Sequence, residues 1–171
     1  MDKRIEKCIK KEQVDEIVRR ILYQYQKYLK FIKSKEYQDL FLEEYEPHKK
    51  QHSISWAISS AFPSGKIICG DLFISRLKYE GGHTRPVLSN DKLELHILNK
   101  TTDFHSKYLK KRYLYNKDNF SNDKIFIYIK FFVDKGKNRL TKISLCLPDE
   151  NGNLVYEELL LNKKDILQFA A

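Results

Sequence analysis

The sequence has few residues that break regular structure and few that bind metals. It contains six glycines, four prolines and one tryptophan in 171 residues, which argues against a disordered or linker-rich chain. Its three cysteines are far apart and form no Cys-x-x-Cys pair, so neither a structural zinc site nor a disulfide framework is expected. Cys69 and Cys146 stand in apolar runs, which predicts small buried side chains in a reducing environment.

Sequence features of membrane proteins and of cofactor-dependent enzymes are also absent. No run reaches the roughly 18 apolar residues of a membrane span, and no apolar segment follows the charged N-terminal residues. We therefore expect a cytoplasmic protein with no membrane partner. There is no phosphate-binding P-loop and no Gly-x-Gly-x-x-Gly fingerprint, so no cofactor is expected. His48 and His52 have helical metal-ligand spacing, but no carboxylate pattern joins them, and no metal site is expected.

Positive charge interleaved with aromatic residues is the main feature that the chain does contain. Lysine and arginine number 32 against 23 aspartates and glutamates, which gives a net charge of +9 and a pI near 9.3. Basic and aromatic residues alternate most densely in residues 23–33 and 104–115. Because cations attract phosphate and aromatic rings stack on bases, the pattern favours an acidic partner, either nucleic acid or an acidic protein surface. The surplus of lysine over arginine is also typical of AT-rich codon usage, which leaves a non-functional origin of the charge open.

The N-terminal part of the chain predicts a long helix. From Gln13 to Lys33, apolar residues recur every three or four positions, and basic residues fill the opposite face. Tyr25 and Tyr28 continue the apolar stripe, so we expect these rings to lie in the core rather than to act as stacking platforms.

Shorter helical segments are expected next. One covers residues 35–45 and ends before Pro47, because proline interrupts a helix. Residues 48–53 predict a polar connector. Residues 53–62 then show helical spacing of apolar positions and predict a short buried helix in which Trp56 packs.

After Gly65 the period of the sequence changes to that of strands. In residues 92–98, Leu93, Leu95 and Ile97 alternate with polar residues, as in a strand with one buried face. Other segments rich in β-forming residues are 66–79, in which Gly70 is expected to form a bulge, 84–88, 124–133, 140–147 and 154–161.

The order of these elements predicts the fold class. The last three strands are joined by short turns and should form an antiparallel meander. Helices are expected over 104–115, capped by Asp103, and after Asn162. The chain is therefore predicted to be α+β, with an N-terminal helical layer packed on a mostly antiparallel sheet that ends in a three-strand meander. We predict a single domain, residues 1–171, made of a helical extension, 1–46, and an α+β core, 54–171.

Residues suited to acid–base chemistry gather between Gly70 and His96. A Gly-Gly turn stands beside His83 and Arg85, and backbone N–H groups with a guanidinium can bind one anion. Asp71, His83 and His96 are general acid–base types, and with Arg85 they form a candidate catalytic set for a metal-independent endoribonuclease. The alternative is a hairpin turn that leaves His83 and Arg85 exposed.

The same stretch resembles the opening of the MazF/PemK ribonuclease toxins. In this chain the Gly-Asp and Gly-Gly pairs are closer together than in those toxins, and turn residues interrupt the apolar strand that follows Arg-Pro-Val. The resemblance implies a small SH3-like barrel, RNA cleavage and a phosphate near Arg85. The residues that carry it are Gly70-Asp71-Leu-Phe, Gly81-Gly82, Arg85-Pro86-Val87-Leu88 and Asn90-Asp91.

A metal-dependent nuclease core of the PD-(D/E)xK type requires two acids and a lysine around a divalent metal. Asp71 and Glu94 have the right chemistry for the acids, but His96 stands where the lysine is required. The pattern therefore disfavours this class of nuclease.

The basic aromatic helix expected over 104–115 is the stronger candidate for binding. Its lysines fall on one helix face with an aromatic stripe beside them, although such a face is also typical of a simple solvated surface. Together with Arg85, the residues expected to contact nucleic acid are Lys107, Tyr108, Lys110, Lys111 and Arg112.

Three functions are compatible with the sequence. The first is a nucleic-acid-binding protein that favours RNA or single strands, since no helix-turn-helix, zinc-finger or RRM signature is present. The second is a protein-binding inhibitor or accessory module of a mobile element or phage, because tyrosine is favoured in interfaces. The third is the endoribonuclease. The sequence leaves open whether the chain is an enzyme and which oligomeric state it adopts.

Overall fold

The computed structural model describes residues 1–32, 46–78, 84–100, 124–134, 139–149, 151 and 153–170. Several predicted features lie outside these ranges. They are the helical piece 35–45, the turn residue His83 and the helix 104–115 with its residues Lys107, Tyr108, Lys110, Lys111 and Arg112.

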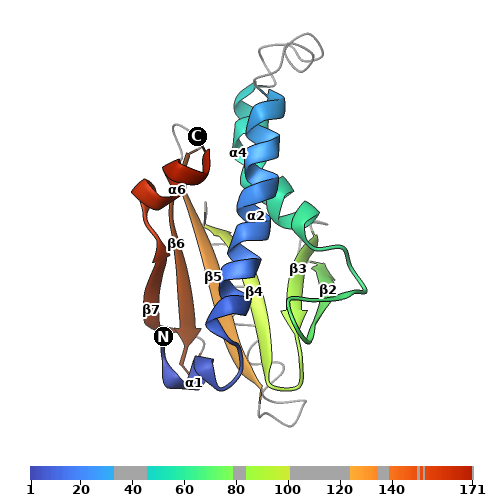
Figure 1. Cartoon of the computed structure of the whole chain (residues 1–171), viewed down its shortest axis with the longest axis vertical. Helices are drawn as coiled ribbons and strands as arrows, with labels where there is room; N and C mark the ends of the chain where they lie inside the picture. Colours follow the sequence, from blue (N-terminus) through green and yellow to red (C-terminus); the bar gives the residue numbers. More distant parts are fainter. Residues whose placement is uncertain are drawn as a thin grey trace.

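The described strands form one seven-stranded sheet in which the spatial order follows the chain, from β1 at one edge to β7 at the other. All neighbouring strands are antiparallel except β4 and β5, which are parallel (Figure 1). This confirms the predicted α+β class and the final three-strand meander, here β5 to β7. The strands are β1 (Ile67–Ile68), β2 (Leu72–Lys78), β3 (Thr84–Ser89), β4 (Leu93–Lys100), β5 (Ile125–Asp134), β6 (Arg139–Pro148) and β7 (Leu154–Leu161).

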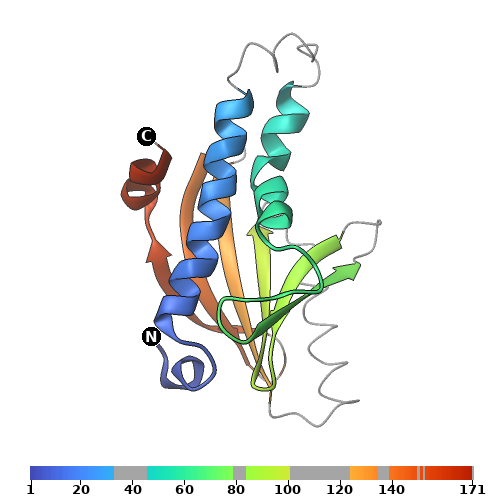
Figure 2. The same cartoon turned by 45° about the vertical axis from the view of Figure 1, so that its right-hand side comes forward.

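Two helices run side by side across one face of this sheet (Figures 1 and 2). They are α2 (Lys11–Ile32) and α4 (Glu46–Ala61), and two shorter helices, α1 (Lys3–Glu6) and α6 (Lys163–Ala170), lie near the β7 edge. The helix expected from Gln13 to Lys33 corresponds to α2, whose apolar stripe is buried as its spacing predicts, Tyr25 included. In α6, the side chain of Asn162 accepts a hydrogen bond from the backbone N–H of Asp165, as expected for an N-cap.

The main hydrophobic core lies between the sheet and these helices. It combines residues of the helices α1, α2, α4 and α6 with residues of every strand from β2 to β6. Its largest fully buried side chains are Phe62 and Phe131. Leu93, Leu95 and Ile97 of β4 all point into this core, as their alternation predicts. We call this side the helix-covered face of the sheet, and the other side the polar face.

The N-terminal boundary of α4 differs from the sequence prediction. The segment 48–53, expected to be a polar connector, is helical, and α4 begins at Glu46. Pro47 stands in the first turn of α4, where its missing N–H has no intrahelical partner to lose. At the other end, the guanidinium of Arg76 on β2 donates to the carbonyl oxygens of Ser59 and Phe62, which satisfies acceptors that the helix end leaves unpaired.

The strand expected over 66–79 is a hairpin rather than one strand with a bulge at Gly70. Ile68 of β1 pairs with Leu72 of β2, and the turn between them contains two left-handed residues, Cys69 at φ 56° and Gly70 at φ 86°. Left-handed residues reverse the strand direction in tight hairpins, and glycine adopts this conformation without steric cost. The prediction was wrong because cysteine gives no turn signal. The side-chain amide of Gln13 donates to the carbonyl oxygen of Cys69 and ties this turn to α2.

The implied SH3-like barrel is also not found. The described residues that carry the resemblance to the MazF/PemK toxins lie in the β1–β2 turn, the start of β2, β3 and the β3–β4 turn, all within the seven-stranded sheet with its two separate edges. Gly81 and Gly82 lie outside the described residues. The likeness is therefore limited to short turn motifs.

The thiol of Cys69 provides a test of the described hairpin. Burial, followed by the nearby charge of Glu16, raises the pKa of this thiol to about 11. Because the thiolate is the reactive form, we expect Cys69 to resist iodoacetamide in the folded protein at pH 8, whereas the half-buried Cys8 reacts first. Peptide mass spectrometry after timed labelling measures both rates, and equal rates for the two thiols would contradict the described burial.

The same shift has a consequence for stability. The folded pKa of Cys69 lies above its ordinary value of 9.0, so the folded state holds this proton after the unfolded state has lost it. The contribution is present below about pH 9 and is lost as the pH rises toward 11. Urea denaturation should show that the free energy of unfolding decreases between pH 8 and pH 10.5, and that this decrease is smaller in Cys69→Ala than in the wild type.

Candidate functional site

The described members of the predicted catalytic set lie in different surroundings. Asp71 is exposed in the β1–β2 turn, where both of its carboxylate oxygens accept from the side-chain amide of Asn90 at 3.3 Å. Arg85 is half-buried on β3. His96 is fully buried on β4. Asp71 therefore ties the β1–β2 turn to the β3–β4 turn.

The sheet register does not bring Asp71 and His96 together. His96 pairs with Val87, which pairs with Ser75, and Asp71 precedes Ser75 by four residues. At about 3.3 Å per residue along a strand and about 4.8 Å between strands, the two side chains lie well over 10 Å apart. By contrast, Arg85 is two residues from Val87, the partner of His96, and so lies on the same face as His96, just beyond the end of the β3–β4 pairing.

A cluster of buried polar side chains occupies the polar face, where sequence analysis had identified only part of it. Between the polar side chains lies a second, smaller group of apolar side chains, formed by Leu98, Phe126, Tyr128 and Cys146. The strand register places the polar and the apolar residues next to one another on β4, β5 and β6. The buried polar residues are Glu94, His96, Lys130 and Ser144.

Glu94 and His96 form the centre of this cluster. They are two residues apart on β4 and so share a face, and Glu94 Oε1 lies 2.9 Å from His96 Nε2. The imidazole stacks on Phe126 with ring centroids 5.6 Å apart and meets the edge of Tyr128 at 6.0 Å. A carboxylate that holds one ring nitrogen fixes the orientation of an imidazole, in active sites and in protein cores alike. Since His96 has no exposed surface, its arrangement here is that of a core residue.

Lys130 shows which signal sequence reasoning missed. The segment Ile127-Tyr-Ile-Lys-Phe131 is apolar apart from this lysine, and a strand with apolar residues on both sides is covered on both faces. A lysine in such a strand is therefore expected to be buried, as Lys130 is.

The described residues contain no group of three or more His, Cys, Asp or Glu side chains that could hold a metal ion.

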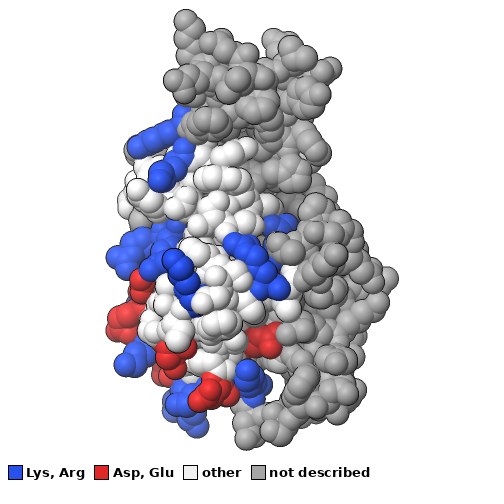
Figure 3. Space-filling view, turned by 90° about the vertical axis from the view of Figure 1, so that its right-hand side faces the viewer, with Lys and Arg blue, Asp and Glu red and all other residues white. Residues whose placement is uncertain are grey.

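A second candidate surface lies on α2, which divides its charges along its length. Its acidic residues are confined to the first part, and after Glu16 all of its charged residues are basic. In Figure 3, the Asp and Glu side chains of the described residues lie in the lower part of the visible face, while Lys and Arg extend into the upper part. The C-terminal half of α2 therefore carries a net positive charge.

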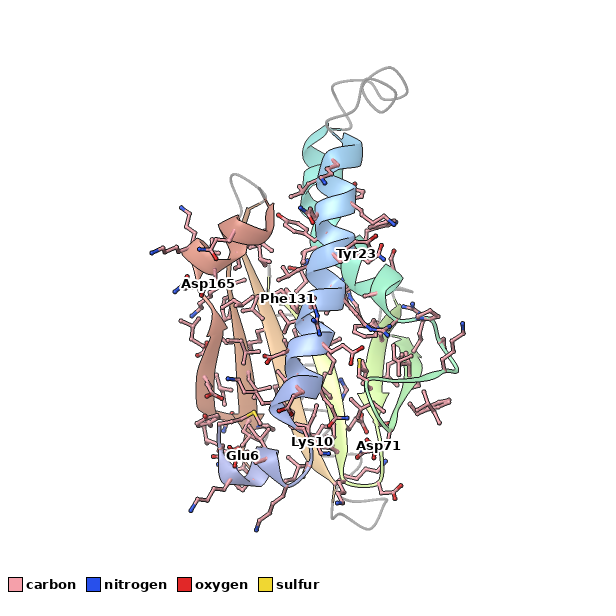
Figure 4. The ribbon with its side chains drawn as sticks, viewed as in Figure 1. Glu6, Lys10, Tyr23, Asp71, Phe131 and Asp165 are labelled. Carbon is pink, nitrogen blue, oxygen red and sulfur yellow. The ribbon has the colours of Figure 1, made fainter. Side chains whose placement is uncertain are left out.

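Tyr23 is at the centre of these basic residues. Its ring is 57% exposed, and the ammonium of Lys27 lies 5.1 Å from the ring centroid, within the range of a cation–π contact. Figure 4 shows Tyr23 on α2, away from the core position of Phe131. Residues three, four and seven positions from Tyr23 share its side of the helix. The basic residues at these spacings are Arg19, Arg20, Lys27 and Lys30.

Trp56 adds a second exposed ring on α4. Its indole packs against Tyr28 of α2, with ring centroids 5.2 Å apart and planes tilted by 31°, and 45% of the residue remains exposed. The expectation that Trp56 packs in a buried helix is therefore met only in part, because the residue contacts Tyr28 but remains exposed. Tyr28 is five positions from Tyr23, about 140° around α2, so its pair with Trp56 lies on a different side of the helix from Tyr23. We use the name aromatic-basic patch for Tyr23 with Arg19, Arg20, Lys27 and Lys30, extended onto α4 by the Tyr28–Trp56 pair.

Comparison of the chain with protein-family models, with curated proteins and with solved structures gives no match. In the part of the chain that the structure describes, no helix is long and apolar enough to cross a membrane.

Proposed function

We propose that this protein binds single-stranded nucleic acid, with RNA favoured, through the aromatic-basic patch on α2 and α4. The observation that carries the proposal is the exposure of Tyr23 beside a run of basic residues on α2, with Trp56 as a second exposed ring on the neighbouring helix α4. Bases of any sequence stack on such rings, while lysine and arginine contact the phosphates that link them. The net charge of +9 increases the attraction at longer range.

The shape of the patch favours a single strand over a duplex. In a duplex the faces of the bases are stacked on each other, so the rings of Tyr23 and Trp56 have access to them only after the strand is opened. A single strand offers free base faces without this cost. The helix predicted over 104–115, with Lys107, Lys110 and Arg112, remains a predicted second contact.

The endoribonuclease hypothesis receives less support. Acid–base cleavage requires an acid and a base on opposite sides of one phosphodiester. Asp71 and His96 are too far apart to share a substrate, and the imidazole is buried. Binding without cleavage is the simpler function for the described surface.

Fluorescence anisotropy with labelled single-stranded RNA, single-stranded DNA and duplex DNA tests the proposal. We expect single strands to bind more tightly than the duplex, with an affinity that falls as salt rises. Four phosphate contacts from the basic residues of α2 would give a slope of log K against log salt of about −3. If none of the three probes changes anisotropy at low salt, the proposal is wrong and codon usage is the better explanation of the charge.

A further inference from the structure

The strand β7 forms one edge of the sheet and pairs with β6 alone among the described strands (Figure 1). An edge strand presents backbone N–H and C=O groups that another strand can bind. Proteins commonly protect such edges with lysine, proline or very short strands. At the opposite edge β1 is two residues long, whereas β7 has eight residues and contains neither lysine nor proline.

Several apolar side chains of β7 are exposed to solvent. Val155 and Leu159 are 55% and 54% exposed, and Leu154 is 43% exposed. Val155, Glu157 and Leu159 alternate along the strand and so lie on one face, with the carboxylate between two aliphatic side chains. Exposed aliphatic residues in a row along an unprotected edge are typical of a surface that a partner covers.

The charge around β7 is opposite to that of the whole protein. Between Lys142 and Lys163 the sequence contains no lysine or arginine, but it contains Asp149, Glu150, Glu157 and Glu158. Glu157 lies 3.5 Å from Lys142, and Glu158 lies 3.3 Å from the N-terminal amine of Met1. In a chain with a net charge of +9, this edge is a local acidic region.

We propose that β7 binds an extended segment of a partner protein that alternates basic and aliphatic residues, and that this segment adds a strand to the sheet. Backbone hydrogen bonds would supply affinity, and lysine or arginine beside Glu157 would supply specificity. The charge argues against a second copy of the chain. In a two-fold antiparallel pair centred on Glu157 or on Glu158, that carboxylate directly faces its own symmetry mate, and directly opposed like charges are destabilising. The same carboxylates repel nucleic acid.

A labelled eight-residue peptide in which lysine alternates with valine is a suitable probe, because its length matches that of β7. We expect binding by fluorescence anisotropy, together with slower amide hydrogen exchange over residues 154–161. Leu159→Lys should weaken binding by about tenfold, and Glu157→Gln by about three- to tenfold, in line with the loss of an apolar contact and of one charge pair.

Two controls make the result specific. Glu12→Gln removes the same charge from the first turn of α2 and should leave peptide affinity unchanged. A peptide with two central prolines keeps most of the charge but cannot join a sheet, and should bind at least tenfold more weakly. The proposal is overturned if the wild type does not bind the probe at millimolar concentration, if the proline peptide binds equally well, or if exchange slows elsewhere than in β7. RNA affinity should not change in Leu159→Lys, which separates this site from the aromatic-basic patch.

Discussion

The double substitution Tyr23→Ala and Trp56→Ala is expected to weaken binding of single-stranded RNA by about 2–6 kcal/mol, which is at least a thirtyfold loss of affinity. Each ring offers a stacking surface worth about 1–3 kcal/mol per base, and each tenfold change in affinity corresponds to about 1.4 kcal/mol. Because Tyr23 is 57% exposed and Trp56 is 45% exposed and lies outside the main core, the fold should tolerate the change. Anisotropy titrations at one fixed salt concentration measure the effect, with circular dichroism as the check on folding.

Two further variants separate stacking from charge. Tyr23→Phe keeps the ring and should bind almost as well as the wild type. Lys27→Met should reduce the magnitude of the salt slope by about 0.7, the value for one phosphate contact on a single strand. An unchanged affinity in the double alanine variant would show that the rings do not contact RNA, and attention would move to the residues predicted over 104–115.

Glu94→Ala is expected to lower the free energy of unfolding by about 1–3 kcal/mol, the usual cost of removing one partner of a buried hydrogen bond. Glu94 and His96 are both buried and lie 2.9 Å apart, so the substitution leaves the imidazole against Phe126 and Tyr128 without its carboxylate. Urea denaturation at pH 7 measures the loss.

A double-mutant cycle shows whether the pair itself is responsible. Glu94→Gln keeps an acceptor at the same position and should cost less than Glu94→Ala. The double variant Glu94→Ala, His96→Ala should be more stable than the sum of the single effects predicts, because the first substitution has already removed the contact that the second would lose. Additive effects would mean that the two side chains do not interact in solution.

Much of the fold is predictable because local signals agree with it. Leu93, Leu95 and Ile97 alternate with polar residues, and they are buried on one face of β4. The meander of β5, β6 and β7 follows from apolar runs joined by short turns. Asn162 precedes a helical pattern and caps α6. In each case the deciding interactions lie within a few residues of one another.

The features that sequence reasoning missed depend on contacts between distant parts of the chain or on ambiguous residues. Pro47 fits the end of one helix as well as the first turn of the next, and α4 uses the second option. Cys69 adopts a left-handed conformation that its type does not suggest. The parallel pairing of β4 with β5 joins segments on either side of a long connection, and no short-range pattern specifies it.

The candidate sites were predictable to different degrees. The charge and aromatic pattern of residues 23–33 drew attention to α2, but the rings of Tyr25 and Tyr28 were expected in the core. Tyr25 is buried, Tyr28 is half-buried, and the ring beside the basic residues is the exposed Tyr23. Trp56 stands opposite the apolar positions Ile54 and Ala57 on α4, so its partial exposure follows from helical spacing once the helix is recognised. The burial of Lys130 was predictable from the apolar residues on both faces of its own strand, but that signal was overlooked.

The single parallel pair in the sheet also has a kinetic consequence. The strands β1 to β4 and β5 to β7 are two runs of antiparallel neighbours, each built from pairings of residues close in sequence. The β4–β5 pair joins the two runs, and its formation requires closure of a long loop whose entropy no hairpin contact offsets. We therefore expect this junction to limit the folding rate of the domain, while interactions within the outer hairpins mainly determine how slowly it unfolds.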